Sequence, residues 1–405
     1  MPRAGQVKPP TDERLSDRVA IGLLTRVFPP DVIDAAVTAA DRGEVRSRLM
    51  PARLTVYYVL AMCLFSGRGY EEVMRLLVGG LEWLGRWRRA WSVPSTAAIA
   101  KARARLGPEP LRELFERAVR PLAAESTRGC WYRGLRLVSM DGTTLDLADT
   151  VENDARFGRP GSGRGEGRSA FPQVRLVGLG ECGTHAVFAA AMGPYATGEK
   201  ALAAGVLPKL GRDMLLLADR GFASYELWQA AAATGAQLLW RASATFSLPV
   251  LEVLPDGSYL SRLLPGRGTR LHRAGAGPVT VRVVEYVIID GRAPEDERYR
   301  LITTLLDPGQ APAAELAGLY AQRWEFENTL DEIKTHQRGA RVVLRSQHPG
   351  GVEQEVWGFL LVHWAIRELM HTAALDAEID PDRVSFTRAL RLARRTVTEQ
   401  AAFSP

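Results

Sequence analysis

The sequence predicts an α/β protein built on a mixed β-sheet, preceded by an all-α domain and followed by further helices. Residues 131–243 show three successive strand patterns, then helix and strand patterns in alternation. Residues 15–125 show helical periodicity throughout, without the strict alternation typical of strands. Apolar residues make up 46% of the chain, which is ample for a folded core.

Composition narrows the class of protein. A length of 405 residues suggests two or three domains. The net charge of +6 permits an anionic partner such as nucleic acid without proving one. Three widely spaced cysteines form no CxxC pair and no disulfide framework, which favours a reducing compartment. The first residues contain no apolar leader, and the apolar run at 54–65 is too short to span a bilayer. We therefore expect a cytoplasmic protein without a membrane partner.

Pattern changes along the chain predict its domain organisation. Short Gly, Pro and Ser breaks separate the early helices, and Ser95 or Thr96 can cap one of them. The expected parts are a disordered tail at 1–14, a helical domain at 15–125, a mixed-sheet core at 131–243 and 311–345, a β-rich insertion at 244–310, and a C-terminal helical region at 346–405.

One segment, YAQRWEFENTLDEIKTHQRG at 320–339, concentrates ionisable side chains. If it forms one continuous α-helix, each residue turns by about 100° and four side chains share an arc of about 60°. Those four are Tyr320, Arg323, Glu327 and Lys334. An acid, two cations and a phenol suit a surface that meets an anionic, metal-binding ligand. The simpler alternative is a surface helix with an ordinary i,i+4 pair between Arg323 and Glu327.

Two aspartates follow apolar strands. Asp141 ends LRLVSMD and Asp219 ends MLLLAD, and α/β folds place ligands at the carboxyl ends of strands. Taken alone, each aspartate is more simply explained as a turn or helix-cap residue. Together with Glu327 they make an all-oxygen donor set, which favours Mg²⁺ or Mn²⁺ over zinc. Three carboxylates can hold two such ions about 4 Å apart, an arrangement suited to phosphodiester chemistry.

The segment at 320–334 has the pattern Y-(2)-R-(3)-E-(6)-K, which resembles the signature of the insertion-sequence-four group of bacterial DDE transposases. SMDGTTLDL and LLLADRGFASYELW resemble the two aspartate motifs of that group, in the expected order. The similarity extends over nearly the whole chain, including the β-rich insertion before the glutamate and the helices at both ends.

The resemblance implies an RNase H-like catalytic core. It implies that Asp141, Asp219 and Glu327 form the catalytic, metal-binding triad, and that Tyr320, Arg323 and Lys334 contact phosphates and a displaced base at the transposon ends. The implied reaction is strand hydrolysis that frees a 3′-hydroxyl, which then attacks target DNA. It also implies that the helical domain at 15–125 binds DNA and that the protein is nucleoid-associated. The partner would be double-stranded DNA, with a homodimer on paired ends, although no dimer motif is visible.

Two weaker signals remain open. The Gly/Arg loop at 154–171 lacks a GxGxxG pattern after a strand, so no nucleotide cofactor is expected; it is equally an ordinary loop or a DNA-contacting one. Glu199 opens a predicted helix, where compensation of the helix dipole explains it adequately.

The functional prediction is therefore a DNA transposase that binds inverted-repeat ends and catalyses metal-dependent strand cleavage and transfer. One alternative is a catalytically idle DNA-binding descendant that acts as a regulator, against which the intact triad argues. The other is a cellular RNase H-like nuclease, which would not need the Tyr–Arg–Lys stripe.

Overall fold

A computed structural model of the chain describes residues 22–44, 49–82, 93–161, 169–243, 245–287, 298–340 and 342–396. The expected disordered tail at 1–14 and the centre of the Gly/Arg loop, 162–168, lie outside these residues. The chain forms two compact units. Unit 1 comprises Met1–Ala118, Glu353–Ile366 and Thr387–Pro405, and unit 2 comprises Val119–Val352 and Arg367–Phe386. The domain boundaries expected from the sequence stay a prediction.

Unit 1 is helical throughout its described part. It contains α1 (Leu23–Val27), α2 (Pro30–Ala39), α3 (Ala52–Leu64), α4 (Tyr70–Glu82), α5 (Thr96–Leu106) and α6 (Glu109–Ala118). It also contains parts of two further helices, α13 (Pro349–Asp376) and α14 (Phe386–Thr396). Every residue from Leu54 to Leu64 is buried, so α3 is the central helix of this unit. Ser95 caps α5 by accepting a hydrogen bond from the Ala98 amide, one of the two caps expected from the sequence.

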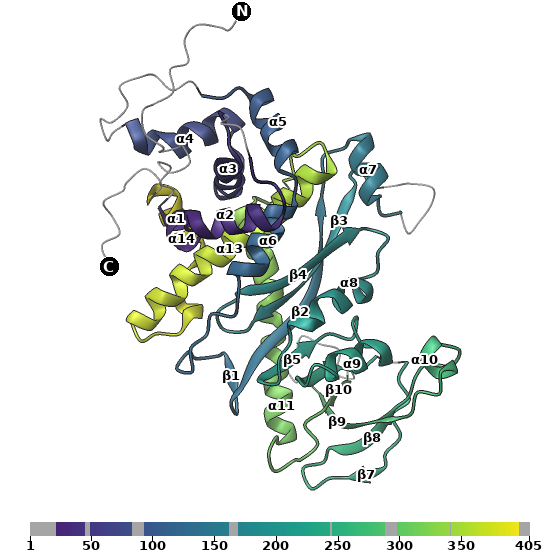
Figure 1. The fold of residues 1–405 in the computed structure, drawn as a ribbon. Coiled ribbons are helices and arrows are strands. Elements are labelled where there is room, and N and C mark those ends of the chain that lie inside the picture. Colours follow the sequence, from purple (N-terminus) through teal and green to yellow (C-terminus); the bar gives the residue numbers. More distant parts are fainter. Residues whose placement is uncertain are drawn as a thin grey trace, which may run out of the picture. The chain divides into compact units, whose positions relative to one another are not determined.

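Unit 2 is built on one mixed sheet with the order β4-β3-β2-β5-β6-β10-β9-β8-β7, and β1 pairs with β2 at the side (Figure 1). The strands are β1 (Trp131–Tyr132), β2 (Leu135–Asp146), β3 (Gln173–Glu181), β4 (Val187–Pro194), β5 (Met214–Ala218), β6 (Gln237–Arg241), β7 (Glu252–Val253), β8 (Tyr259–Leu263), β9 (Val279–Val287) and β10 (Arg298–Thr303).

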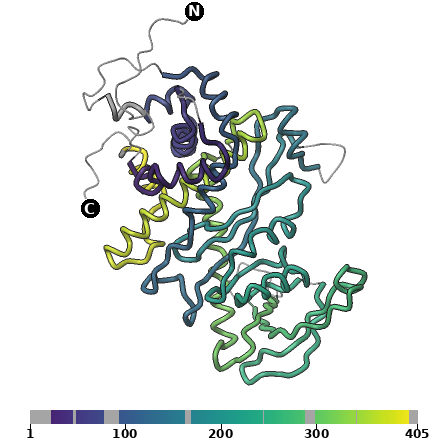
Figure 2. Tube along the Cα trace, viewed as in Figure 1, coloured from purple at the N-terminus to yellow at the C-terminus, as the bar shows by residue number. Residues whose placement is uncertain are grey.

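The first five strands of the order carry the predicted core. Strands β2, β3 and β4 form an antiparallel meander, and β5 and β6 run parallel to β2. This arrangement of a meander followed by two parallel strands is the RNase H-like topology, so the predicted fold class is confirmed. The chain then leaves β6 for the region of β7 to β9 and returns through β10, which pairs antiparallel with β6 (Figure 2).

Helices cover both faces of this sheet. The helices and short helical turns of unit 2 outside α13 and α14 are α7 (Val151–Phe157), α8 (Glu199–Val206), η2 (Leu207–Lys209), α9 (Tyr225–Ala232), α10 (Arg270–Arg273), α11 (Ala313–Tyr320), η3 (Ala321–Arg323), α12 (Trp324–Asp331), η4 (Glu332–Gln337) and η5 (Pro381–Arg383). Trp228 of α9 packs edge-on against Trp240 of β6 on one face. On the other face Leu316 of α11 shares a buried cluster with Leu217 and Leu239.

A buried arginine attaches the region of β7 to β10 to α11. Arg282 is fully buried and donates hydrogen bonds to Ser258 Oγ (2.8 Å) and to the carbonyl oxygen of Ala311 (2.6 Å), and it pairs with Asp256. Asp256 in turn accepts a hydrogen bond from the amide of Ala313, the first residue of α11 (2.8 Å). These bonds fix the start of the helical run that carries the predicted site residues.

No helix in the described part of the chain combines the length and apolar character needed to cross a membrane.

Candidate active site

The register of the sheet brings Asp141 and Asp219 together. β2 and β5 run parallel, and their last paired residues are Met140 and Ala218. The two aspartates are therefore the next residues on neighbouring strands. Asp219 follows the end of β5, as predicted. The prediction that Asp141 ends its strand was wrong, because β2 continues to Asp146 on the hydrogen bonds of its other neighbour, β3.

Alternation along the strands shows which face the two side chains share. Successive residues of a strand point to opposite faces, so Asp141 lies on the face of Leu137 and Asp219 on the face of Leu217. Leu137 and Leu217 belong to the buried cluster that contains Leu316 of α11. Both carboxylates therefore lie on the side of the sheet covered by α11.

The helical run that carries Glu327 is not one continuous α-helix. It passes from α11 through the 3₁₀ turn η3 into α12 and then into the π-helical segment η4. Each type of helix winds by a different angle per residue, so the uniform step of about 100° assumed from the sequence does not hold over 320–334, and the shared arc of the four side chains stays a prediction. Glu327 lies on α12, and Arg323 and Lys334 lie on the two non-α segments that flank it.

Glycines let α12 lie directly on the sheet. A Cβ atom on Gly180 would lie 2.1 Å from the ring of Phe326, and one on Gly178 would lie 3.2 Å from it. Gly178 pairs with Asp141 across β2 and β3, and Gly180 pairs with Ser139. The Phe326 ring therefore packs on strand backbone beside Asp141, which positions its neighbour Glu327 near Asp141.

Arg323 is the cation of this site. Its Nη1 donates a hydrogen bond to Glu327 Oε1 (2.8 Å) and lies 3.7 Å from Asp141 Oδ2. The residue is only 5% exposed, and its Nε has no partner within the described structure. Burial opposes its charge, but Tyr320, Glu327 and Asp219 outweigh that effect and raise the pKa of the guanidinium. Arg323 thus balances part of the negative charge that the carboxylates bring together.

Arg323 does not fully offset the effect of burial on Asp141. Burial raises the pKa of its carboxyl group to about 6; the Gly142 amide and Arg323 oppose the rise, whereas Glu327 and Glu199 add to it. The Gly142 amide donates to Asp141 Oδ1 at 2.7 Å. Ionisation of Asp141 is therefore less favourable than that of a free aspartate, chiefly because the group is buried, and added positive charge nearby would favour the ionised form.

Glu199, the first residue of α8, lies near Asp141 but on the other face of the sheet. A Cβ atom on Gly142 would lie 3.1 Å from the Glu199 carboxyl carbon, and successive residues of β2 point to opposite faces. Glu199 Oε1 lies 3.8 Å from Arg175, whose strand partner Thr144 is on the same face as Gly142. Its position in the first turn of α8 agrees with the explanation by the helix dipole, and its charge adds to the raised pKa of Asp141.

Tyr320 and Lys334 have different environments. Tyr320 is 4% exposed and belongs to the buried cluster, and its hydroxyl bonds to the Ala218 carbonyl oxygen (3.3 Å), which holds the end of β5 beside Asp219. Lys334 Nζ donates to Thr143 Oγ1 (3.0 Å), two residues along β2 and hence on the same face as Asp141. The DNA contacts expected of both residues stay predictions.

Carboxylate oxygens fit a hard divalent ion, and the raised pKa of Asp141 fits a site that gains from added positive charge. The three predicted ligands do not bring one oxygen each within 4.8 Å of one another; in the described part of the chain only His185, Glu325 and Asp382 do so. Two ions with a shared carboxylate do not require such a close group of three.

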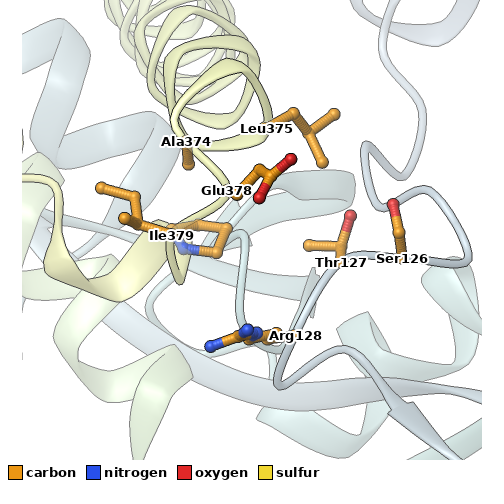
Figure 3. Close-up of a pocket in the computed structure, with 8 residues that line it drawn as sticks. Ser126, Thr127, Arg128, Ala374, Leu375, Glu378 and Ile379 are labelled. Carbon is orange, nitrogen blue, oxygen red and sulfur yellow. The ribbon is translucent and has the colours of Figure 1, made fainter.

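A cavity of about 360 Å³ lies elsewhere in unit 2, between the loop after α6 and the end of α13 (Figure 3). Its lining includes Ser126, Thr127, Arg128 and Glu378 but none of the predicted site residues. Thr127 also hydrogen-bonds to His371 (2.9 Å). The predicted site is thus separate from this enclosed space.

Two family models match the chain. One, described as insertion element 4 transposase N-terminal, matches residues 18–116, and the other, described as transposase DDE domain, matches residues 132–364, more than half of the chain. The chain belongs to the IS4-family DDE transposases. It is a DNA transposase, and nothing in its matches or its structure favours an idle regulator or a cellular nuclease.

Two sequence relatives agree with this assignment. The transposase is 29% identical over 380 residues to Transposase InsG for insertion sequence element IS4 of Escherichia coli (strain K12), an alignment that covers 93% of this chain and 83% of InsG. It is 24% identical over 217 residues to Putative transposase InsZ of the same organism, covering 54% of this chain and 69% of InsZ. A solved structure, the piggyBac transposase synaptic complex with hairpin DNA, aligns with a TM-score of 0.48 and 9% identity over 93% of this chain and 79% of that one. Membership of the DDE family implies that the enzyme acts on DNA and depends on a divalent metal ion.

The pKa of Asp141 predicts a pH dependence of stability in metal-free buffer. The folded-state value of about 6 lies above the ordinary 3.8, so this carboxyl group stabilises the fold at low pH and loses that contribution as the pH rises through about 6. Asp141→Asn removes the titration. Between pH 5 and pH 7.5 we expect the unfolding free energy of the wild type to fall by about 1 kcal/mol relative to Asp141→Asn.

The measurement is urea unfolding of both proteins in EDTA at the two pH values. Groups that both proteins share cancel in the difference. A difference that stays the same at both pH values would show that Asp141 is not perturbed as described.

Proposed function

We propose that Asp141, Asp219 and Glu327 hold two Mg²⁺ or Mn²⁺ ions and catalyse strand cleavage and strand transfer at the inverted-repeat ends of an insertion sequence. The observation that carries the proposal is the pair of aspartates on neighbouring parallel strands, on the face covered by α11, with Glu327 bonded to the same Arg323 that lies beside Asp141.

In the first step water attacks the scissile phosphorus, the bond from phosphorus to the 3′ oxygen breaks, and the strand ends in a 3′-hydroxyl and a 5′-phosphate. Divalent ions held by the three carboxylates would supply activation of the attacking oxygen and charge stabilisation at the leaving oxygen. Arg323, buried and positively charged, stabilises the charge that develops on the phosphate. In the second step the freed 3′-hydroxyl loses its proton and attacks a phosphorus of target DNA. The bond from that phosphorus to the 3′ oxygen of the target strand breaks as the new phosphodiester bond forms, and no covalent intermediate with the protein forms.

We further propose that Lys334 contacts the phosphate next to the scissile one, because its ammonium group lies on the Asp141 face of β2. Tyr320 holds the end of β5 in the metal-free protein and contributes to the DNA contact only if its ring leaves the buried cluster. A homodimer on paired ends would let each copy cleave one end of the element.

The test uses the full chain and a labelled duplex that carries the terminal inverted repeat flanking the coding region. We expect a nick at the repeat boundary with Mg²⁺ or Mn²⁺, and no nick in EDTA. The new end should be extended by a DNA polymerase, which requires a 3′-hydroxyl. A duplex with a scrambled repeat is the control. Cleavage of both duplexes alike would favour a nuclease, and cleavage in EDTA would exclude the proposed chemistry.

A further inference from the structure

A buried histidine lies in the turn between β3 and β4, away from the carboxylates of the candidate site. His185 is 7% exposed and has a left-handed backbone, with φ of 57°. A residue with a Cβ rarely adopts this conformation unless its surroundings hold it there. Arg367 Nη2 lies 2.7 Å from His185 Nδ1, and Asp382 Oδ1 lies 3.1 Å from its Nε2. The side chain therefore lies between groups from two distant parts of the sequence.

The same turn contacts two carboxylates on either side of Glu327. Glu325, two residues before Glu327, accepts a hydrogen bond from the Gly183 amide in the turn and lies 3.8 Å from His185 Nε2. Glu332, five residues after Glu327, accepts a hydrogen bond from Arg367 Nε at 3.0 Å and a second one from its Nη2.

The ion pair between Arg367 and Glu332 is largely buried. Arg367 is 3% exposed, and the Glu332 side chain is 14% exposed. An ion pair in such surroundings with direct hydrogen bonds fixes geometry far better than a surface pair, and removing one partner leaves an uncompensated buried charge. We call His185, Arg367, Glu325 and Glu332 the His185 clamp.

Which ring nitrogen of His185 carries the proton determines whether this cluster suits a metal ion or a hydrogen-bonded contact. Guanidinium groups only donate hydrogen bonds, so Nδ1 must accept from Arg367 and the ring proton sits on Nε2. Nε2 lies 3.1 Å from an Asp382 oxygen and 3.8 Å from a Glu325 oxygen but makes no hydrogen bond to either. Ligand atoms of His185, Glu325 and Asp382 do lie within 4.8 Å of one another, close enough for one ion. A metal at Nε2 would have to displace the proton while Arg367 still occupies Nδ1, so the arrangement fits a hydrogen-bonded clamp better than a metal site.

We propose that His185 and Arg367 are positioning residues that hold the helical run on both sides of Glu327 against the β3–β4 turn. The inference rests on the proposed catalytic role of Glu327. Glu327 lies on a segment that changes from 3₁₀ to α to π winding within 17 residues, so its own helix does not fix its place as firmly as a continuous α-helix would. A displacement of about 1 Å in such a group costs on the order of 100-fold in rate.

The test compares single-turnover cleavage of the end duplex by His185→Ala, His185→Asn and Arg367→Gln. Asparagine tolerates the left-handed backbone and keeps an acceptor for Arg367, whereas alanine does neither. We expect His185→Ala and Arg367→Gln to cleave 10- to 100-fold more slowly at saturating protein and to need more Mg²⁺ for half-maximal rate. We expect His185→Asn to recover most of the loss. DNA affinity, from gel shift, should stay within about twofold of the wild type.

Glu315→Gln is the matched control for a Glu332→Gln variant. Both changes remove a carboxylate that pairs with an arginine, but the pair of Glu315 with Arg133 is exposed and lies outside the clamp. Only Glu332→Gln should slow cleavage. Thermal melting of each variant separates lost positioning from lost folding, and the comparison of His185→Ala with His185→Asn carries the test if Arg367→Gln does not fold.

The outcomes also separate this inference from the proposed function. Cleavage by folded His185→Ala and Arg367→Gln at the wild-type rate, alongside an inactive Glu327→Gln, would overturn the clamp alone. An active Glu327→Gln would overturn the proposed function. Binding of Mn²⁺ that is lost in Asp382→Asn would identify the cluster as a metal site and would overturn the clamp as well.

Discussion

Glu327→Gln is expected to lower strand cleavage at least about 1,000-fold while leaving DNA binding within about twofold of the wild type. The amide oxygen of glutamine can still accept the hydrogen bond from Arg323, which reaches Glu327 Oε1 at 2.8 Å in the wild type. Packing of α12 should therefore survive. What disappears is the negative charge, and a neutral amide is a poor ligand for a hard divalent ion. Single-turnover cleavage of the end duplex in Mg²⁺ measures the effect.

Asp331→Asn is the matched control on the same helix. Asp331 is exposed, lies one turn beyond Glu327 and accepts a hydrogen bond from Thr335 Oγ1 (2.5 Å), so its loss should leave cleavage unchanged. A Glu327→Gln variant that retains more than a tenth of the wild-type rate would show that Glu327 does not hold a catalytic ion.

Most of the fold could be predicted from the sequence, because it follows from local hydrophobic patterns and their order along the chain. Apolar runs with turn signals marked β2, β3, β4, β5 and β6 in sequence, and a meander followed by βα units leaves few ways to pair them. The sequence did not show that β5 pairs with β2 rather than with β4, because strand pairing depends on contacts between residues far apart in the chain. The pairing of Asp141 with Gly178 likewise extends β2 beyond the residue where its parallel neighbour stops.

The sequence supplied the residue types of the candidate site, whose roles stay predictions, but not its geometry. Periodicity assumes one helical winding, whereas the run changes from 3₁₀ to α to π around Glu327. His185 gave no distinctive local pattern. The partners of His185 lie up to 197 residues away in the chain, at Asp382, so only the folded structure brings them into view.

Gly180→Ala is expected to disturb the site through packing alone. A methyl group at this position would lie 2.1 Å from Cδ2 and 2.2 Å from Cε2 of Phe326, far inside contact distance. The residue is buried in β3 and has an ordinary strand backbone, so the added Cβ itself causes no strain at residue 180. The Phe326 ring must move, and α12 moves with it. Overpacking of this kind costs about 1–3 kcal/mol of stability, and we expect cleavage to fall on the order of 100-fold because Glu327 follows Phe326 directly.

Two comparisons isolate the cause. Gly318→Ala, in α11, meets no atom within 4 Å and should raise stability by about 0.5–1 kcal/mol without slowing cleavage. Phe326→Ala removes the ring that the methyl group added by Gly180→Ala would strike, so the double variant should be more stable than the sum of the two single effects. Thermal melting and single-turnover cleavage of the four proteins measure both quantities. Cleavage by Gly180→Ala at the wild-type rate would show that close packing of Phe326 on β3 does not position Glu327. The glycines of the VGLGE strand would then have no role in catalysis.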